Sequence, residues 1–112
     1  MASGHYELTK SSNGQYHFNL KASNGEIILS SEMYASKASA ENGIASVQTN
    51  SPHEAQFEVK ISSNNKPYFV LKAKNHQVIG TSQMYSSDSA AKSGIQSVIK
   101  NGSTTDVRDL SA

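Results

Sequence analysis

A chain of 112 residues is long enough for one domain of ordinary size, which buries about 65% of the surface of its unfolded chain. The sequence contains no cysteine, which excludes disulfide bonds, thiolate metal sites and a cysteine nucleophile. Ten basic residues balance nine acidic ones without a run of like charges, so the chain lacks the electrostatic footprint of proteins that bind DNA, RNA or anionic membranes.

The N-terminal residues MASGHYELTK lack the basic start and apolar core of a signal peptide, and no apolar run approaches membrane-spanning length. We therefore expect a soluble cytoplasmic protein. Hydrophobic residues make up only 36% of the chain, but they recur periodically, which argues against disorder.

The chain repeats itself at a distance of 51 residues. Residues 5–50 align with residues 56–101 without a gap, and 20 of these 46 positions are identical. Met33-Tyr34, for example, returns as Met84-Tyr85. Two copies are too few for a solenoid, so we expect one domain, residues 1–112, whose two halves share a core about a pseudo-twofold axis.

Each copy begins with alternating apolar residues, which are typical of strands. In the first copy the alternation runs through YEL at residues 6–8 and YHFNLKA at residues 16–22. An apolar face on both strands requires a register such as Leu8 opposite Phe18, with Gly14 at positive φ in the intervening loop.

The following segment SNGE predicts a two-residue type I′ turn at Asn24-Gly25. This turn would place Ala22 opposite Ile27 on the apolar face. The second copy has Asn75-His76 at the same place, and histidine adopts the left-handed conformation less readily than glycine.

A helix with one buried face follows in each copy, and Ser36 and Ser87 are its candidate N-caps. Small and apolar residues recur at i, i+3, i+4 and i+7: Ala40, Gly43, Ile44 and Val47, and Ala91, Gly94, Ile95 and Val98. A glycine inside a helix costs about 1 kcal/mol relative to alanine. We therefore expect both glycines to lie so close to the sheet that a β-carbon would collide.

Only one strand fits after the first helix, at residues 55–60, and a final strand fits at residues 106–110. The strand between the helices is therefore expected to serve both halves, with the first and last strands finding partners across the join. The sequence predicts an α+β fold: tandem β-β-β-α-β units that share one antiparallel sheet of about seven strands, with two helices on one face.

The segment NGEIILSSEMYASKASAENGIASV and its second copy resemble the YegP-like family of small bacterial repeat proteins. The resemblance covers nearly the whole chain, including YELTKSSNGQYHFNLKA and NHQVIGTSQMY. It implies that the last strand of each unit is exchanged into the other unit. The family is one of unknown function, so the resemblance implies no catalytic or binding residues.

Residues with the chemistry for catalysis or metal binding are scattered. The four histidines lie on different predicted elements, and no nucleophile elbow, phosphate-binding loop or zinc-ligand spacing is present. We therefore predict no cofactor, no metal and no catalytic residues.

Two surfaces remain as candidates for interaction. The Met-Tyr loops carry Tyr34 and Tyr85, which either close the end of the core or contact a partner. The sheet face away from the helices carries Tyr68, Val70 and Ile79 as an apolar cluster, next to Lys21 and Lys72.

From these surfaces we predict a non-catalytic binding or interaction module that meets an unknown protein or small ligand, as a monomer or a weak homodimer. The alternative is a nucleic-acid-binding module that uses Tyr68, Lys21 and Lys72. The second alternative is an enzyme of unrecognised type.

Overall fold

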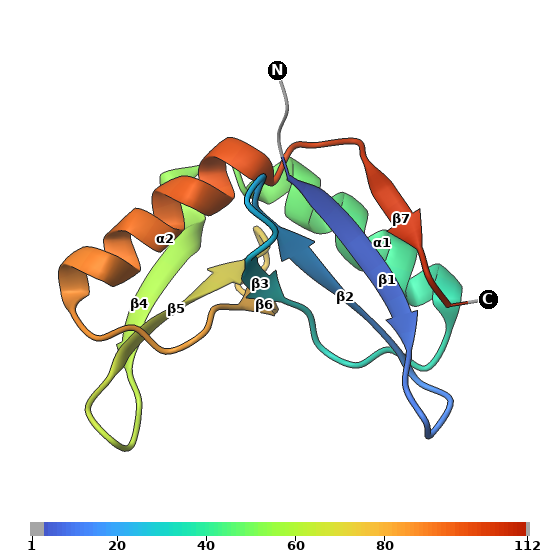
Figure 1. The fold of residues 1–112 in the computed structure, drawn as a ribbon, viewed down its shortest axis with the longest axis horizontal. Coiled ribbons are helices and arrows are strands. Elements are labelled where there is room, and N and C mark those ends of the chain that lie inside the picture. The colour runs from blue at the N-terminus through green and yellow to red at the C-terminus, as the bar shows by residue number, and fades with distance from the viewer. Residues whose placement is uncertain (1–3, 112) are drawn as a thin grey trace.

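Two helices cover one face of a single seven-stranded sheet in the computed structural model, which describes residues 4–111 (Figure 1). The elements in chain order are β1 (His5–Lys10), β2 (Tyr16–Lys21), β3 (Ile27–Ser30), α1 (Lys37–Asn50), the 3-10 turn η1 (Glu54–Gln56), β4 (Phe57–Ile61), β5 (Pro67–Lys72), β6 (Val78–Thr81), α2 (Asp88–Asn101) and β7 (Val107–Asp109). The α+β prediction is confirmed.

The strands lie in the order β4-β5-β6-β3-β2-β1-β7, so the two copies meet where β3 pairs with β6. The strand after each helix joins the other half of the sheet: β4 pairs with β5, and β7 pairs with β1. This is the exchange that the family resemblance implies. Because β4 lies at an edge and pairs with β5 alone, the expectation that it serves both halves is wrong.

One pair of strands departs from the antiparallel pattern, because β7 runs parallel to β1 with Val107 level with Tyr6. Helix α2 ends beside the start of β1, where the Gly4 N–H donates to the Asn101 side-chain oxygen (2.7 Å). The chain therefore enters β7 from the end at which β1 begins, and the two strands run in the same direction.

The helices bind the two halves together. Helix α1 contacts β2 of its own copy and β5 and β6 of the other, and α2 contacts β5 of its own copy and β2 and β3 of the other. This reciprocity is what an approximate twofold axis between β3 and β6 produces. The shared core includes Tyr6, Leu8, Phe18, Leu20, Leu29, Ile44, Val47, Phe69, Leu71, Ile95 and Val98.

All four hairpins close in the same way. In the second one the Gly25 N–H donates to the Ala22 carbonyl and the Ala22 N–H donates to the Glu26 carbonyl (both 2.9 Å). This is a three-residue loop whose last residue is left-handed, and Gly14, Asn65 and His76 hold the same position elsewhere. The type I′ prediction is therefore wrong, and Lys21, not Ala22, lies level with Ile27.

The helix predictions are confirmed. The Ser36 Oγ accepts from the Ser39 N–H and the Ser87 Oγ accepts from the Ala90 N–H (both 3.1 Å). A β-carbon on Gly43 would lie 2.8 Å from the Tyr34 Cζ and 2.9 Å from a ring carbon of Phe18, and Gly94 has equivalent neighbours. Each helix therefore approaches the core most closely at its glycine, which packs against two aromatic rings of its own copy.

Candidate interaction surfaces

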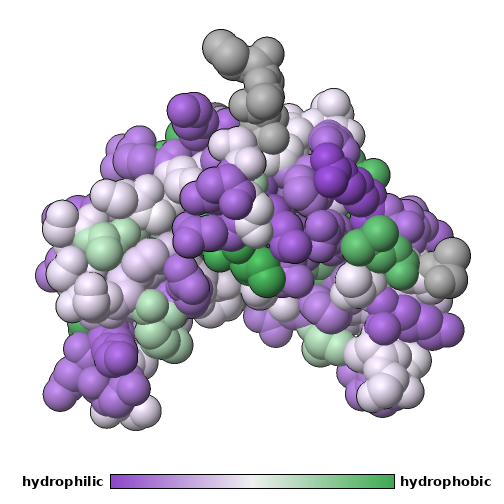
Figure 2. Space-filling view, viewed as in Figure 1, coloured by the Kyte–Doolittle hydropathy of each residue, from purple (hydrophilic) through white to green (hydrophobic). Residues whose placement is uncertain are grey.

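The sheet bends so that its β1–β2 and β4–β5 hairpins project away from the helices at the two ends (Figure 1). Figure 2 shows the hollow that this leaves between the two hairpins, with largely hydrophilic side chains around it. One residue from each strand forms a row across this sheet face: Glu58, Val70, Thr81, Ser30, Asn19, Glu7 and Arg108. The row is mainly polar.

The two predicted lysines, Lys21 and Lys72, are ion-paired. Lys21 lies 3.1 Å from the Glu7 carboxylate, which also contacts His5 at 2.9 Å. The hydrogen bond from His5, followed by that from Lys21, lowers the pKa of Glu7. Lys72 contacts Glu58 in the equivalent place, and this hydrogen bond lowers the pKa of Glu58. Each lysine is therefore balanced locally by a carboxylate.

The expected apolar cluster of Tyr68, Val70 and Ile79 does not form. Tyr68 lies opposite Lys60 and is half-buried, whereas Val70 is buried between its neighbours on β4 and β6. A bulge between β5 and β6 shifts the register by one residue next to Ile79. Ile79 therefore belongs to the core on the helix side, which corrects the prediction that it lies on the open face.

The Met-Tyr loops place their tyrosine rings against the core. Tyr34 stacks on Phe18 with ring centroids 6.2 Å apart, and Tyr85 stacks on Phe69 at 6.0 Å. Burial raises the pKa of both tyrosines. Both rings close the end of the core, while the neighbouring Met33 and Met84 are 45% and 48% exposed.

A groove of about 480 Å³ lies between α1 and the β5–β6 hairpin, next to the first Met-Tyr loop. We call it the α1 groove. Its lining combines apolar side chains with amides, hydroxyls and one carboxylate, that of Glu32: Glu32, Met33, Tyr34, Ser39, Asn42, Gly43, Ser46, Ala73, Asn75, Gln77, Val78 and Ile79. Of the predicted residues, it brings together Tyr34 and Ile79, which come from different copies.

The four histidines do not assemble into a site, although His17 lies opposite Thr9 as its strand position predicts. Residues 4–111 contain no group of three or more His, Asp or Glu side chains that could hold a metal ion. Within the same range, no helix is both long and apolar enough to cross a membrane.

Comparison with known proteins identifies the architecture. The family described as "Domain of unknown function (DUF1508)" matches residues 11–58 and again residues 62–109, two matches that begin 51 residues apart (62 − 11). UPF0339 protein YegP of Yersinia pestis is 74% identical over 110 residues, which cover 98% of each chain. A UPF0339 protein of Shewanella oneidensis is 62% identical, covering 96% of this chain and 98% of the relative.

Two structures solved by NMR have the same fold. The UPF0339 protein of Shewanella oneidensis superimposes with a TM-score of 0.92 and 61% identity, over 98% of this chain and 93% of that one. The Escherichia coli protein of unknown function yegP gives a TM-score of 0.94 and 54% identity, over 100% and 97%. The chain therefore belongs to the YegP (UPF0339) family, and it carries two tandem copies of the family's domain of unknown function.

Proposed function

We propose that this chain is a non-catalytic binding module whose ligand site is the α1 groove. The observation that carries the proposal is a groove of about 480 Å³ next to an exposed methionine. That volume lies in the range of small-molecule sites, and methionine side chains adapt to varied apolar ligands.

The lining of the groove favours a ligand with both apolar and hydrogen-bonding parts and without negative charge, because the charged side chain in this lining is the Glu32 carboxylate. Met33 and Val78 offer apolar contact, while the side-chain amides of Asn42, Asn75 and Gln77 offer donors and acceptors. A small ligand of this kind, or a short neutral peptide, would match the groove.

The nucleic-acid alternative receives less support. The affinity of a protein for nucleic acid comes largely from lysines and arginines that neutralise phosphates. Lys21 and Lys72 are each paired with a carboxylate, and Tyr68 is half-buried and lies on β5, three strands away from the β2 strand that carries Lys21. An enzyme is also less well supported. The raised pKa values belong to Lys37, which is ion-paired with Asp109, and to tyrosines that pack against the core; Tyr34 lines the α1 groove, but its ring is stacked on Phe18.

The test is an amide NMR titration of labelled protein with a panel of small neutral amides and aromatic alcohols, each at millimolar concentration. We expect chemical-shift changes clustered at Asn42, Asn75 and Val78 for a subset of the panel. Met33→Ala should weaken these shifts, and Met84→Ala, the equivalent exposed methionine, should leave them unchanged. Shifts that scatter over the surface, or that respond equally to both substitutions, would refute the α1 groove as the site.

A further inference from the structure

The two halves of the sheet differ at their outer edges. Strands β1 and β4 are equivalent under the 51-residue shift, which aligns Tyr6 with Phe57 and Leu8 with Val59. Strand β7 lies beside β1, whereas β4 is itself an edge strand, and no strand within residues 4–111 pairs with its outer side. The first half therefore has one strand more than the second.

Strand β7 covers apolar residues that are exposed in the second half. Tyr6 and Leu8, next to β7, are 0% and 1% exposed, whereas of their equivalents on β4 Phe57 is half-buried and Val59 is 39% exposed. A groove of about 390 Å³ runs between β4 and α2 and is lined by Glu54, Phe57, Val59, Lys92, Ile95 and Gln96. We call it the β4 groove. It occupies the place that β7 fills in the first half.

The backbone of β4 is oriented to accept a strand. The Phe69 carbonyl accepts from the Ser82 N–H on the β6 side (2.9 Å), so Phe69 directs its backbone groups away from β4. Val59 lies opposite Phe69 and consequently directs its own N–H and carbonyl away from β5, toward the open edge. On β1 the equivalent Leu8 carbonyl accepts from Leu110 (2.8 Å). The same hydrogen bond is available at Val59.

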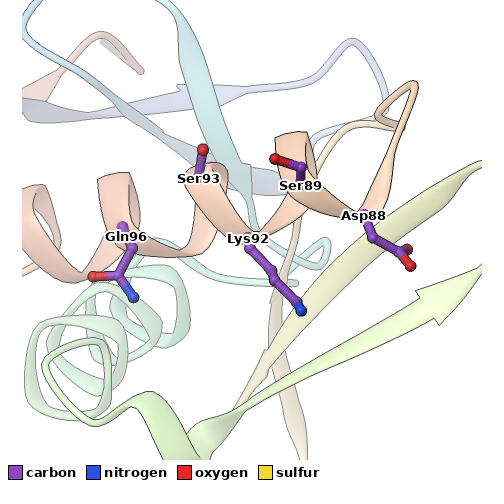
Figure 3. Close-up of a pocket in the computed structure, with 5 residues that line it drawn as sticks. All are labelled: Asp88, Ser89, Lys92, Ser93 and Gln96. Carbon is purple, nitrogen blue, oxygen red and sulfur yellow. The ribbon is translucent and has the colours of Figure 1, made fainter.

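The charges beside the two grooves are reversed. In the first half Lys37, at the start of α1, forms an ion pair with Asp109 of β7. The shift of 51 residues places Asp88 where Lys37 stands and Lys92 where Glu41 stands. In Figure 3 the side chains of Asp88, Lys92 and Gln96 extend from the same side of α2, and Lys92 and Gln96 also line the β4 groove. A strand placed like β7 would therefore have the Asp88 carboxylate where β7 has Lys37, next to the position that Asp109 occupies.

We propose that the β4 groove binds an extended peptide segment of another protein, which adds to the sheet as an eighth strand parallel to β4. The segment carries an apolar residue level with Phe57 and a lysine or arginine level with Val59, in the places that Val107 and Asp109 occupy beside β1. Backbone bonds at Val59 hold the segment, and Asp88 selects its basic residue. The site shares no lining residue with the α1 groove, so either proposal can fail alone.

The charge reversal also argues against a second copy of this chain as the occupant. Strand β7 of another copy would bring Asp109 toward Asp88 in place of Lys37. Like charges that face each other across an interface weaken association. A partner with a basic residue in this position gains an attraction instead.

The probe is a synthetic peptide with the sequence of residues 104–111, TTDVRDLS, carrying Asp109→Lys. Added to full-length labelled protein, it should shift the amide signals of Val59, Ile61, Lys92 and Ile95. The unsubstituted peptide is the matched control, and we expect it to bind about fivefold more weakly because an attraction is replaced by a repulsion. In Asp88→Lys protein the preference between the two peptides should reverse.

A second variant tests the backbone part of the proposal. Val59→Pro removes an N–H that faces the open edge, a change that edge strands tolerate. We expect this variant to keep its dispersed amide spectrum and to lose the peptide-induced shifts. Three results would overturn the proposal: no shifts at millimolar peptide, equal binding of both peptides in both proteins, or self-association at β4 that depends on protein concentration and excludes the peptide.

Discussion

Replacing Gly43 with alanine tests whether the helix must lie this close to the sheet. Alanine is intrinsically better in a helix by about 1 kcal/mol. Its β-carbon, however, would lie 2.8 Å from the Tyr34 Cζ and 2.9 Å from a ring carbon of Phe18. Tyr34 can move toward solvent only by giving up its stacking, and Phe18 is fully enclosed, so the ring has no room to yield.

Overpacking a core of this kind costs about 2–3 kcal/mol, which exceeds the gain in helix propensity. We therefore expect Gly43→Ala to lower the free energy of unfolding by about 1–2 kcal/mol and the melting temperature by roughly 4–8 °C. Urea denaturation followed by circular dichroism measures the change. The neighbouring Asn42→Ala, at an exposed helix position, should raise stability by about 0.5 kcal/mol.

A double-mutant cycle identifies the cause. In a Tyr34→Leu background the smaller side chain leaves space beside the helix, and Gly43→Ala should be less destabilising there by at least about 0.5 kcal/mol. If Gly43→Ala were as stable as the parent or more stable, helix propensity alone would govern the position. The packing explanation would then fail for Gly94 as well.

Three further predictions concern single interactions. His76→Gly relieves a left-handed histidine (φ 68°) and should raise the free energy of unfolding by about 0.5–1 kcal/mol in urea denaturation; a loss of stability would show that the histidine ring contributes more than the strain. Hydrogen bonds from Lys37 and then Ser111 lower the pKa of Asp109 to about 2, so its stabilising contribution is present above its ordinary pKa and is lost as the pH falls toward 2. Carboxyl NMR should record that midpoint and its return toward 3.8 in Lys37→Ala. Tyr6→Phe removes the hydrogen bond from the Tyr6 hydroxyl to the Gly102 carbonyl (2.5 Å) and should lower the free energy of unfolding by about 1–3 kcal/mol. An unchanged midpoint of urea denaturation would contradict this role.

The elements and the strand alternation follow from local patterns, and so they were predictable. Leu8 lies opposite Phe18 as the alternation requires, and both serine caps form. The way in which the hairpin loops close was not predictable, because Asn24-Gly25 suits both a two-residue turn and the three-residue loop that forms. That longer loop is accompanied by a bulge, and the bulge turns Ile79 from the open face to the core.

The grooves were harder to predict than the fold, because each of them joins segments that are distant in the chain. The α1 groove combines α1 of the first copy with the hairpin before Val78 of the second. The open edge at β4 depends on the pairing of β7 with β1, which runs parallel, against the predicted antiparallel pattern. One signal was present in the sequence: the charges at Lys37 and Glu41 reverse at Asp88 and Lys92, although the buried residue between them repeats as Ala40 and Ala91.

The halves also differ where they meet, and there the physical reason is direct. A residue on a twofold axis contacts its own equivalent, so two large side chains would collide there. Leu29 of β3 instead packs on Gly80, its equivalent in β6, where a β-carbon would lie 2.6 Å from a Leu29 methyl. Ser51, which follows α1, likewise packs on its equivalent Gly102, which follows α2. A β-carbon added to Gly102 would lie 2.5 Å from the Ser51 β-carbon.

Two identical subunits could not adopt this packing, because each would present the same side chain to the other. Joining both copies in one chain allows a large residue on one side of the axis and a glycine on the other. The same freedom lets one copy bind β7 along its edge while the other keeps β4 open with reversed charge. The tandem chain can thus use one half to complete its own sheet and the other half to receive a different strand.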